Sequence, residues 1–545
     1  MAQKNRAWWQ SGVIYQIYPR SYMDSNNDGI GDLKGITSRL DYLQELGIDA
    51  IWLSPFYPSP MADFGYDISD YCNVDPLFGT LADFDEMVAA AHARGIRVVV
   101  DYVPNHTSDQ HPWFQESRRS RQNPKRDWYV WRDPKANGDP PNNWISVFGG
   151  PAWEYDEATG QYYLHSFLSQ QPDLNWRNPE VKKTMLEVLR FWLDRGVDGF
   201  RIDVAHFIMK DPELRDNPLQ PPSDEPNWKP MGEYDRLIHL HDRGHPDVHG
   251  VFREIRALLN AYSTERPRYS VGEIHVFDWD DWASYYGRNL DELHMPFNFG
   301  LVNIDWKAPA IRKMVEGVEG ALSRLHPEAW SNYVLGNHDE HRIASRVGPE
   351  QARMAMLLLL SLRGTPTLYY GDELGMLDGD IPADKEKDPW GLRQPGLGLG
   401  RDPERTPMQW DASVNGGFTA PEVEPWLPVS PNTSEISVAA QRGNPRSMLN
   451  LSKALLTMRR STPALNQGTY TSVEGVPPEC FAFIRQAGDQ KRLVLTNFTS
   501  LDLRISLPNL GQGNLLISSY LDRAGRVDLA AFHLRENEGC IIELL

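Results

Sequence analysis

Three carboxylic acids, each at the end of a short apolar run, are the residues of this sequence best suited to chemistry. They are Asp203, Glu273 and Asp339. A carboxylate can attack an electrophilic carbon, and a protonated carboxyl group can give its proton to a leaving atom. Two such groups about 5 Å apart suit glycoside hydrolysis with retention of configuration, and a third can bind sugar hydroxyls while the ring distorts.

The segments around these acids alternate between strand and helix patterns. Apolar runs predict strands, and apolar residues at helical spacing follow most of them. The predicted strands cover residues 13–18, 50–53, 97–103, 199–204, 269–274, 294–299, 331–335 and 365–370. Eight strands in this alternation are the number that closes a parallel (β/α)8 TIM barrel, so the fold class is α/β.

The C-terminal ends of the strands in such a barrel meet at one mouth. Arg201 and Asp203 are two residues apart in one strand and therefore share a face. His106 follows the third strand and His338 the seventh, so we expect both at the same mouth. We expect Arg201 to keep Asp203 ionised, and like charge in a dry setting to raise the pKa of Glu273 so that it holds its proton.

Two parts of the chain depart from the barrel pattern. Residues 107–176 carry no long helical pattern and are rich in Trp, Pro, Gly and Asn, which predicts a subdomain inserted after the third strand. Residues 467–545 contain short alternating strands, which predict a C-terminal antiparallel β domain. The catalytic barrel then comprises residues 1–106 and 177–466.

Composition limits the partners and the compartment. The net charge of −19 argues against nucleic acid and anionic membranes, and no apolar run is long enough to span a membrane. Three widely spaced cysteines (Cys72, Cys480 and Cys540) and a start without the apolar core of a signal peptide predict a cytoplasmic location. We expect a monomer or a homodimer that acts on a small molecule.

Four ordered segments resemble the conserved regions of glycoside hydrolase family 13, the α-amylase family. They are DYVPNH (101–106), GFRIDVA (199–205), GEIH (272–275) and GNHD (336–339). Three others are similar to the oligo-1,6-glucosidase and α-glucosidase group, namely ADFGYDISDY (62–71), QPDLNW (171–176) and ERTPMQW (404–410). The resemblance spans the chain and implies a retaining, exo-acting α-glucosidase that takes terminal glucose from short α-glucosides.

The resemblance also implies roles for individual residues. Asp203 would be the nucleophile, Glu273 the acid/base and Asp339 the transition-state stabiliser. Other implied residues of the glucose pocket are Tyr66, which would stack beneath the ring, and His106, Phe148, Phe167, Gln171, Arg201 and His338. Asp63 and Arg405 resemble an ion pair that closes the pocket around the terminal 4-hydroxyl, with Arg401 as the alternative arginine.

Residues 24–32 alternate oxygen-bearing side chains as a cation-binding loop does. An EF-hand would need Glu at its twelfth position, which is Gly35 here, and this segment follows a predicted strand. The resemblance implies a structural Ca²⁺ or Mg²⁺ held by Asp24, Asn26, Asp28, the carbonyl of Ile30, and Asp32. A solvated turn is the alternative interpretation, and no organic cofactor is expected.

The preferred linkage depends on residues around the mouth. Val204 follows Asp203 directly, and in the resembled group valine here accompanies α-1,6 activity whereas threonine accompanies α-1,4 preference. The hypothesis is therefore tolerance of isomaltose-type linkages, although Val204 could simply pack the barrel as a strand residue. The long segment 210–251 is expected to shape the leaving-group site.

Two other functions fit parts of this pattern. A transferring or isomerising enzyme of the same family, of the trehalose synthase or sucrose isomerase type, would share every catalytic residue and differ in its products. A non-catalytic sugar-binding protein on this barrel would have lost catalytic acids, and all three are present here.

Overall fold

A parallel eight-stranded sheet forms the centre of the computed structural model, which describes residues 6–223 and 230–545. The strands are β1 (Ile14–Ile17), β2 (Ala50–Leu53), β3 (Arg97–Tyr102), β7 (Gly199–Ile202), β8 (Tyr269–Gly272), β9 (Met295–Pro296), β10 (Asn332–Val334) and β11 (Thr365–Tyr369). Their order is β10-β11-β1-β2-β3-β7-β8-β9. Each predicted strand is found, and the predicted barrel is confirmed.

The side chain of Asn332 connects the two ends of this sheet. Its Nδ2 donates to the carbonyl of Pro296 in β9 at 2.5 Å, and its Oδ1 accepts the N–H of Asn298 at 2.9 Å. The barrel therefore closes between β9 and β10 through a side chain instead of a backbone ladder. Barrel strands are covered on both faces, which is why they read as nearly continuous apolar runs.

Helices surround the barrel and begin where the sequence supplies caps. Thr80 and Asp83 form a capping box at the start of α5 (Leu81–Ala93). Asn178 caps α7 (Pro179–Asp194), whose first residue is proline. The other long helices are α8 (Val248–Ala261), α10 (Ala308–Leu325), α12 (Pro349–Ser361) and α15 (Met448–Ser461).

Shorter helices complete the barrel and its connections. They are α1 (Trp8–Ser11), α2 (Pro19–Tyr22), α3 (Leu33–Ser38), α4 (Leu40–Leu46), α9 (Trp279–Ser284), α11 (Ile343–Val347), α13 (Pro389–Arg393), α14 (Val438–Arg442) and α16 (Pro463–Asn466). Among the described residues, no helix has both the length and the apolar composition needed to cross a membrane.

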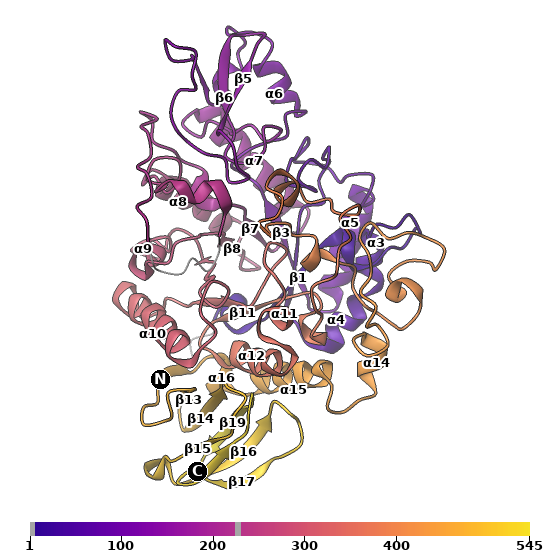
Figure 1. Cartoon of the computed structure of the whole chain (residues 1–545), viewed down its shortest axis with the longest axis vertical. Coiled ribbons are helices and arrows are strands. Elements are labelled where there is room, and N and C mark those ends of the chain that lie inside the picture. The colour runs from indigo at the N-terminus through magenta and orange to yellow at the C-terminus, as the bar shows by residue number, and fades with distance from the viewer. Residues whose placement is uncertain (1–5, 224–229) are drawn as a thin grey trace.

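The chain between β3 and β7 builds a separate small unit at the top of Figure 1. It contains α6 (Pro112–Ser117) and a three-stranded sheet of β4 (Trp131–Arg132), β6 (Gln161–Leu164) and β5 (Trp153–Asp156) in that order. Phe114, Trp131 and Tyr163 pack ring against ring in its interior. This aromatic core explains the tryptophan-rich composition of the segment.

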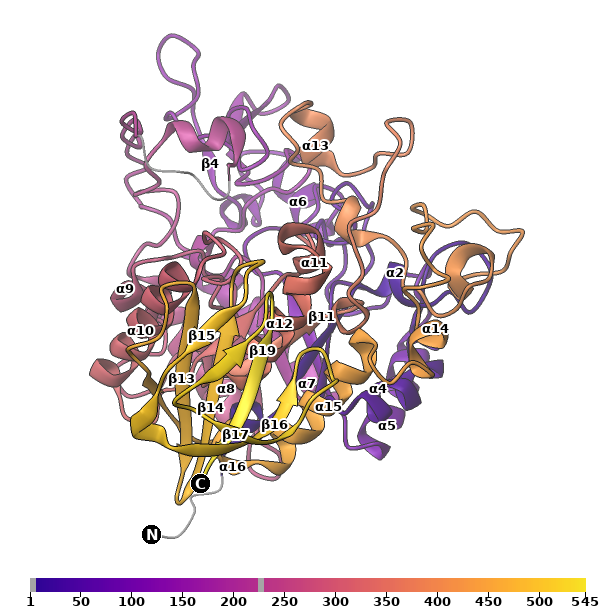
Figure 2. The same cartoon turned by 60° about the horizontal axis from the view of Figure 1, so that its bottom comes forward.

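Antiparallel strands form the C-terminal part of the chain, which lies below the barrel in Figure 1 and comes forward in Figure 2. Six of them pair in the order β12 (Thr469–Ser472), β13 (Cys480–Ala487), β14 (Gln490–Asn497), β19 (Gly539–Leu544), β16 (Gln512–Ser518) and β17 (Gly525–Asp528). A second pair is β15 (Leu503–Ile505) with β18 (Phe532–Leu534).

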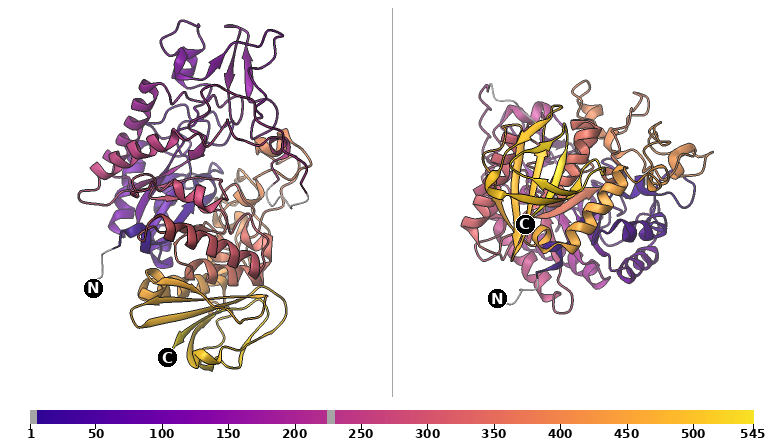
Figure 3. Two further views of the ribbon diagram at one scale, coloured as in Figure 1. Left: turned by 90° about the vertical axis from the view of Figure 1, so that its left-hand side faces the viewer. Right: turned by 90° about the horizontal axis from the view of Figure 1, so that it is seen from below.

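Helix α12 lies between the barrel and this C-terminal sheet (Figure 1) and contacts β14 and β19. The left-hand view of Figure 3 shows the three tiers of the molecule, with the inserted unit at the end opposite the sheet. Residues 354–360 are buried because α12 is covered on both sides. This double burial accounts for the most apolar run of the chain, which forms a core helix.

Candidate active site

Strand register brings Asp203 and Glu273 together. Strands β7 and β8 are parallel, with Ile202 opposite Gly272, and each acid is the next residue along its strand. The ladder continues past both strands, because the N–H of Glu273 donates to the carbonyl of Ile202 at 2.9 Å. The two carboxyl groups are therefore neighbours at the mouth of the barrel, as the sequence predicts.

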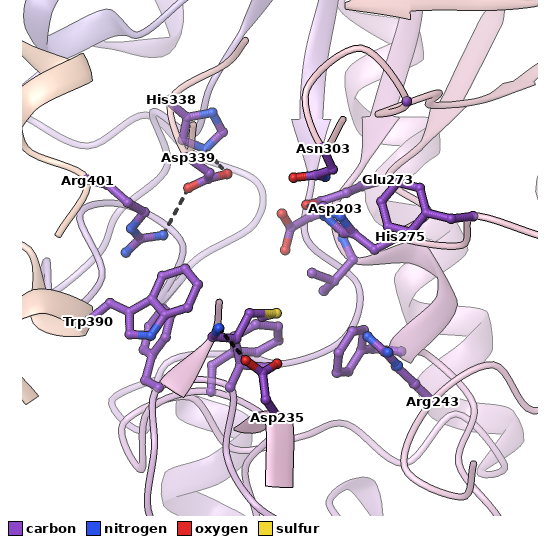
Figure 4. A pocket seen from close by; sticks show the side chains of 18 of the residues that line it. Asp203, Asp235, Arg243, Glu273, His275, Asn303, His338, Asp339, Trp390 and Arg401 are labelled. Atoms are coloured by element: carbon purple, nitrogen blue, oxygen red, sulfur yellow. Dashed lines mark hydrogen bonds and ion pairs between the residues drawn. The ribbon is translucent and has the colours of Figure 1, made fainter. Parts of the chain in front are cut away.

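A cavity of about 880 Å³ lies over this mouth. Its wall includes Asp203, Glu273 and Asp339 together with residues from the loops that follow the strands. Figure 4 shows Asp203 and Glu273 on one side and Asp339 with His338 on the other. Of the remaining predicted residues, the cavity is lined by Asp63, Tyr66, His106, Phe148 and Phe167.

The Arg201 guanidinium lies beneath the cavity and holds both acids. Its Nη1 is 2.6 Å from Asp203 Oδ1, and its Nη2 is 2.6 Å from Glu273 Oε2. Nη1 also lies 2.8 Å from Asp101, the residue opposite Arg201 in β3. With 1% of its side chain exposed, Arg201 contacts the acids from behind and does not line the cavity.

The protonation balance of the two acids differs from the sequence-based expectation. Burial raises the pKa of Asp203 well above its usual range, although the Arg201 charge opposes this shift. Burial also acts to raise the pKa of Glu273, but Arg201 and the hydrogen bond from His275 outweigh it and the pKa lies below its usual range. The expected raised pKa of Glu273 is therefore wrong for this pocket.

The pKa of Glu273 is lowered by contacts whose geometry the sequence motifs do not specify. Glu273 Oε2 accepts the backbone N–H of Val204 at 3.0 Å, and Oε1 lies 2.9 Å from His275 Nε2. Of the contacts that stabilise Glu273, Asp203 has only the ion pair with Arg201. Hydrogen bonds stabilise the ionised form of a carboxyl group, and Glu273 accepts more of them than Asp203 does. The negative charge is therefore favoured on Glu273.

Two buried histidines are neutral hydrogen-bonding groups of the cavity. Burial lowers the pKa of His338 to about 3 and that of His106 to about 4. The His338 ring stacks parallel to Tyr66, and its Nε2 is 2.5 Å from the Tyr66 hydroxyl. A neutral imidazole both donates and accepts a hydrogen bond, which suits the hydroxyl groups of a sugar.

The expected ion pair between Asp63 and Arg405 is wrong, because Arg401 takes that place. Arg401 Nη2 lies 2.8 Å from Asp63 Oδ1, and Arg401 Nη1 lies 3.0 Å from Asp339 Oδ1. The reason is Asp388, which accepts both the backbone N–H and the Nε–H of Arg401 and aims its guanidinium at Asp63.

Arg405 binds the same oxygen of Asp339 as Arg401 does. Its Nη2 lies 2.9 Å from Asp339 Oδ1, and its Nε donates to the carbonyl of His338 at 2.7 Å. It is fully buried and does not line the cavity, so its contacts orient the loop that carries Asp339. Arg405 is the last residue of the 3-10 turn η5 (Pro403–Arg405), and Arg401 precedes that turn.

Gln171 also lies behind the cavity wall. Its Nε2 is 3.1 Å from Asp63 Oδ2 and 3.1 Å from His106 Nε2. The Phe167 ring packs 5.3 Å from the ring of His106 and 5.8 Å from that of Phe148. Gln171 therefore positions two of the predicted pocket residues, and the two phenylalanines form an apolar side of the cavity.

The family profile described as "Alpha amylase, catalytic domain" matches residues 16–468, a span that begins within β1 and contains the other seven strands of the barrel and every acid of the cavity. The chain belongs to the α-amylase family. As a member of this family it is a glycoside hydrolase, and the sequence-based expectation of this family is confirmed.

Curated relatives of this α-amylase family member are similar along almost their whole length. A probable alpha-glucosidase of Rhizobium meliloti is 43% identical over 517 residues, which cover 93% of this chain and 92% of the relative. An oligo-1,6-glucosidase of Parageobacillus thermoglucosidasius is 41% identical over an alignment that covers 94% of this chain and 95% of the relative.

Solved structures of the family share the fold. The alpha-glucosyl transfer enzyme XgtA has a TM-score of 0.93 and 41% identity, and the match covers 99% of this chain and 100% of that one. The trehalulose synthase MutB has a TM-score of 0.88 at 36% identity, with the same coverage. Relatives that share this fold or sequence are thus named as glucosidases, as an alpha-glucosyl transfer enzyme and as a trehalulose synthase.

Several cavity residues of this family member were not assigned from the sequence. His275 lies inside the GEIH motif and stacks 4.5 Å above Phe299, so the motif itself contained the signal. Phe207 and Trp390 line the apolar side. Met231, Asp235 and Arg243 come from the segment 210–251, of which residues 224–229 lie outside the described part of the chain.

The loop 24–32 is arranged as a series of Asx turns. Asp24 Oδ1 accepts the N–H of Asn26 at 2.9 Å, and Asp28 Oδ1 accepts the N–H of Ile30 at 2.9 Å. Asp32 caps helix α3 through the N–H of Gly35. The two oxygens of Asp28 accept one hydrogen bond each, whereas those of Asp24 and Asp32 accept two each. The side chains supply the oxygen donors that a hard cation prefers, and a bound cation would replace some of these turn contacts.

Proposed function

We propose that this α-amylase family member is a retaining, exo-acting α-glucosidase that removes terminal glucose from short α-glucosides. The observation that carries the proposal is the pair Asp203 and Glu273 on one guanidinium, in a cavity whose far wall holds the Asp63–Arg401 ion pair. That ion pair would receive the 4-hydroxyl of a terminal glucose and leave no room for a further sugar.

Hydrolysis then proceeds by two displacements. In the first, an Asp203 oxygen bonds to the anomeric carbon while the glycosidic bond breaks and Glu273 gives its proton to the leaving oxygen. In the second, water bonds to the same carbon and gives a proton to Glu273, and the bond to Asp203 breaks. Asp339, held by Arg401 and Arg405, faces the ring hydroxyls and favours the distorted ring of the transition state.

Catalysis requires charge on Asp203 and a proton on Glu273, whereas burial raises the pKa of Asp203 and the contacts of Glu273 with Arg201 and His275 lower its pKa. One proton shared by the coupled pair meets this requirement. A glucose ring bound next to Asp203 places its anomeric carbon, which carries partial positive charge, near the Asp203 oxygens. This charge favours the carboxylate form of Asp203. The glycosidic oxygen next to Glu273 gives the proton an acceptor, which favours the protonated form of Glu273 in the substrate complex.

The alternative is a transferring or isomerising enzyme, which the names of XgtA and MutB bring into consideration. Such an enzyme would pass the glucosyl group from Asp203 to a sugar hydroxyl instead of to water. The deciding experiment incubates the protein with maltose, isomaltose, trehalose, sucrose and starch and identifies the products by chromatography. Free glucose from the short substrates supports hydrolysis, whereas sugar isomers without glucose support the alternative.

The cation of the 24–32 loop is a separate part of this proposal. Asp24, Asn26, Asp28, the Ile30 carbonyl and Asp32 would hold a structural Ca²⁺ or Mg²⁺, supported by the oxygen-only chemistry of these donors. Asp24 is almost fully buried and is also bonded to the Thr419 hydroxyl, which ties the loop to a distant segment. A chelator should lower the melting temperature, and added Ca²⁺ or Mg²⁺ should restore it. No change after verified metal removal would contradict this proposal.

The compartment and the oligomeric state are proposals as well. Cys480 and Cys540 are buried free thiols and Cys72 is a half-buried free thiol, which supports a cytoplasmic location. We propose a monomer or homodimer, which light scattering on the purified protein would measure directly.

A further inference from the structure

Outside the cavity, three side chains with metal-binding atoms meet where three loops come together. His341 follows the loop of Asp339, Asp378 follows the turn η4 (Asp372–Leu374), and Glu404 belongs to η5. His341 Nδ1 lies 2.9 Å from Asp378 Oδ2 and 3.7 Å from Glu404 Oε2. One ligand atom from each residue lies within 4.8 Å of the other two.

The Glu404 carboxylate is the unusual member of this group. Its side chain is only 2% exposed, and its Oε2 has no hydrogen-bond partner. Burial raises the pKa of Glu404 well above its usual range, against the opposing charge of Arg405. A buried carboxylate oxygen without a partner is costly, so its orientation toward His341 calls for a ligand.

We propose that His341, Asp378 and Glu404 bind a divalent transition-metal ion, with Zn²⁺ as the best match. One imidazole nitrogen and two carboxylate oxygens are ligands that Zn²⁺ accepts, with water completing the tetrahedron. Ligand atoms about 2.1 Å from such an ion are about 3.4 Å apart, and the two distances from His341 lie on either side of that value.

A protonated His341 that binds Asp378 directly is the competing account of the same contacts. The hydrogen bond to Asp378 raises the pKa of His341, so the imidazolium form is favourable there. That form satisfies Asp378, but it leaves Glu404 Oε2 beyond hydrogen-bond distance. The nearby arginine does not fill the gap, because the Arg405 nitrogens are bonded to Asp339 and to the His338 carbonyl.

Occupancy would connect this metal site with the loops around Asp339. Glu404 precedes Arg405, and His341 stands two residues after Asp339. Asp378 Oδ1 also accepts the backbone N–H of Arg342 at 2.8 Å. A metal ion would therefore fasten η5 to the loop after β10, and it would do so without contact with the reacting atoms.

Zinc binding tests the proposal directly. Tag-free protein is stripped with a chelator and dialysed against Zn²⁺, and bound metal is measured by mass spectrometry. The wild-type chain is expected to bind one Zn²⁺ more than His341→Asn and one more than Glu404→Gln. Cation binding in the 24–32 loop is unaffected by either substitution, so the difference belongs to this site.

A matched control and a second probe make the test decisive. His533 pairs with Asp502 at 2.8 Å on the C-terminal part and is exposed to a similar degree, so His533→Asn should bind as much Zn²⁺ as the wild-type chain. Co²⁺ should give visible absorption bands in the wild-type chain that His341→Asn lacks. Equal Zn²⁺ in wild type and His341→Asn, a half-exposed position that tolerates change, would overturn the proposal.

Discussion

Arg401 Nη2 lies 2.8 Å from Asp63 Oδ1, and this ion pair forms one wall of the cavity over the barrel mouth. The same guanidinium reaches Asp339 at 3.0 Å and Asp388 at 2.6 Å. One arginine therefore joins the recognition end of the cavity to a catalytic acid. The planar guanidinium makes this possible, because Nη1 binds Asp339, Nη2 binds Asp63 and Asp388, and Nε binds Asp388 as well.

Replacing Arg401 with lysine tests this shared role. Lysine keeps the charge but cannot serve three carboxylates at once, so kcat/KM on the preferred glucoside should fall about 10- to 100-fold. Most of the loss should be a rise in KM, since Asp63 would hold substrate in both ground and transition states. Arg324→Lys, in an exposed ion pair with Asp280, is the control and should behave as wild type. An unchanged KM in Arg401→Lys would count against the pair as a recognition element.

Replacing Glu273 with glutamine separates the two chemical steps. The variant has no proton to give, so hydrolysis of a disaccharide should fall by about 10²- to 10⁴-fold. A substrate whose leaving group needs no proton, such as glucosyl fluoride, should lose much less. Rates on the two substrates give the comparison. An equal loss on both substrates would show that Glu273 is not the acid.

Buried histidines predict how stability changes with pH. Burial lowers the pKa of His165 to about 4, while in the unfolded chain it is about 6.5. Between these values the unfolded chain binds the extra proton, so this contribution to stability is complete above pH 6.5 and is lost as the pH falls toward 4. His165→Gln should therefore gain on the order of 3 kcal/mol relative to wild type between pH 6.5 and 4.

Denaturant unfolding at several pH values measures this difference. Carboxyl groups with shifted pKa values contribute equally to both proteins and cancel in the comparison. The exposed His533→Gln variant is the control, and its curve should follow that of wild type. A constant difference between His165→Gln and wild type across this range would refute the assignment.

Much of the barrel and its acids could be predicted because both depend on local pattern. Strand runs and their ends are set by residues close in sequence, and parallel register then places Asp203 beside Glu273. The ion pair between Asp63 and Arg401 could not be predicted from local sequence pattern. Both arginines stand in one short segment, and which one faces the cavity depends on side-chain contacts with Asp388 that no sequence pattern states.

The sequence-based expectation of a raised pKa for Glu273 was wrong for a similar reason. This pKa depends on the backbone N–H of Val204 and on the ring of His275, whose directions no motif states. Val204 lies beyond the end of β7 with a positive φ of 34° and lines the cavity beside Phe207. The interpretation of Val204 as a packing residue within a strand is therefore wrong, and its role in linkage choice is a prediction.

Replacing Val204 with threonine tests that role. The added hydroxyl faces the apolar group of Phe148, Phe167 and Phe207, where a methyl group now packs. We expect the ratio of isomaltose to maltose hydrolysis to fall about tenfold, a change of the size that a single group in a pocket produces. Kinetics on both disaccharides decide the matter. An unchanged ratio would remove Val204 from the specificity determinants.

The covalent intermediate on Asp203 is the central claim, and trapping it is the most direct test. A slow fluorinated glucosyl fluoride should let the glucosyl-enzyme accumulate, and peptide mass spectrometry after rapid quenching locates the bond. We predict one glucosyl adduct on the peptide that contains Asp203, and none in Asp203→Asn of unchanged fold. Steady turnover with no adduct, or an adduct on another residue, would contradict the account.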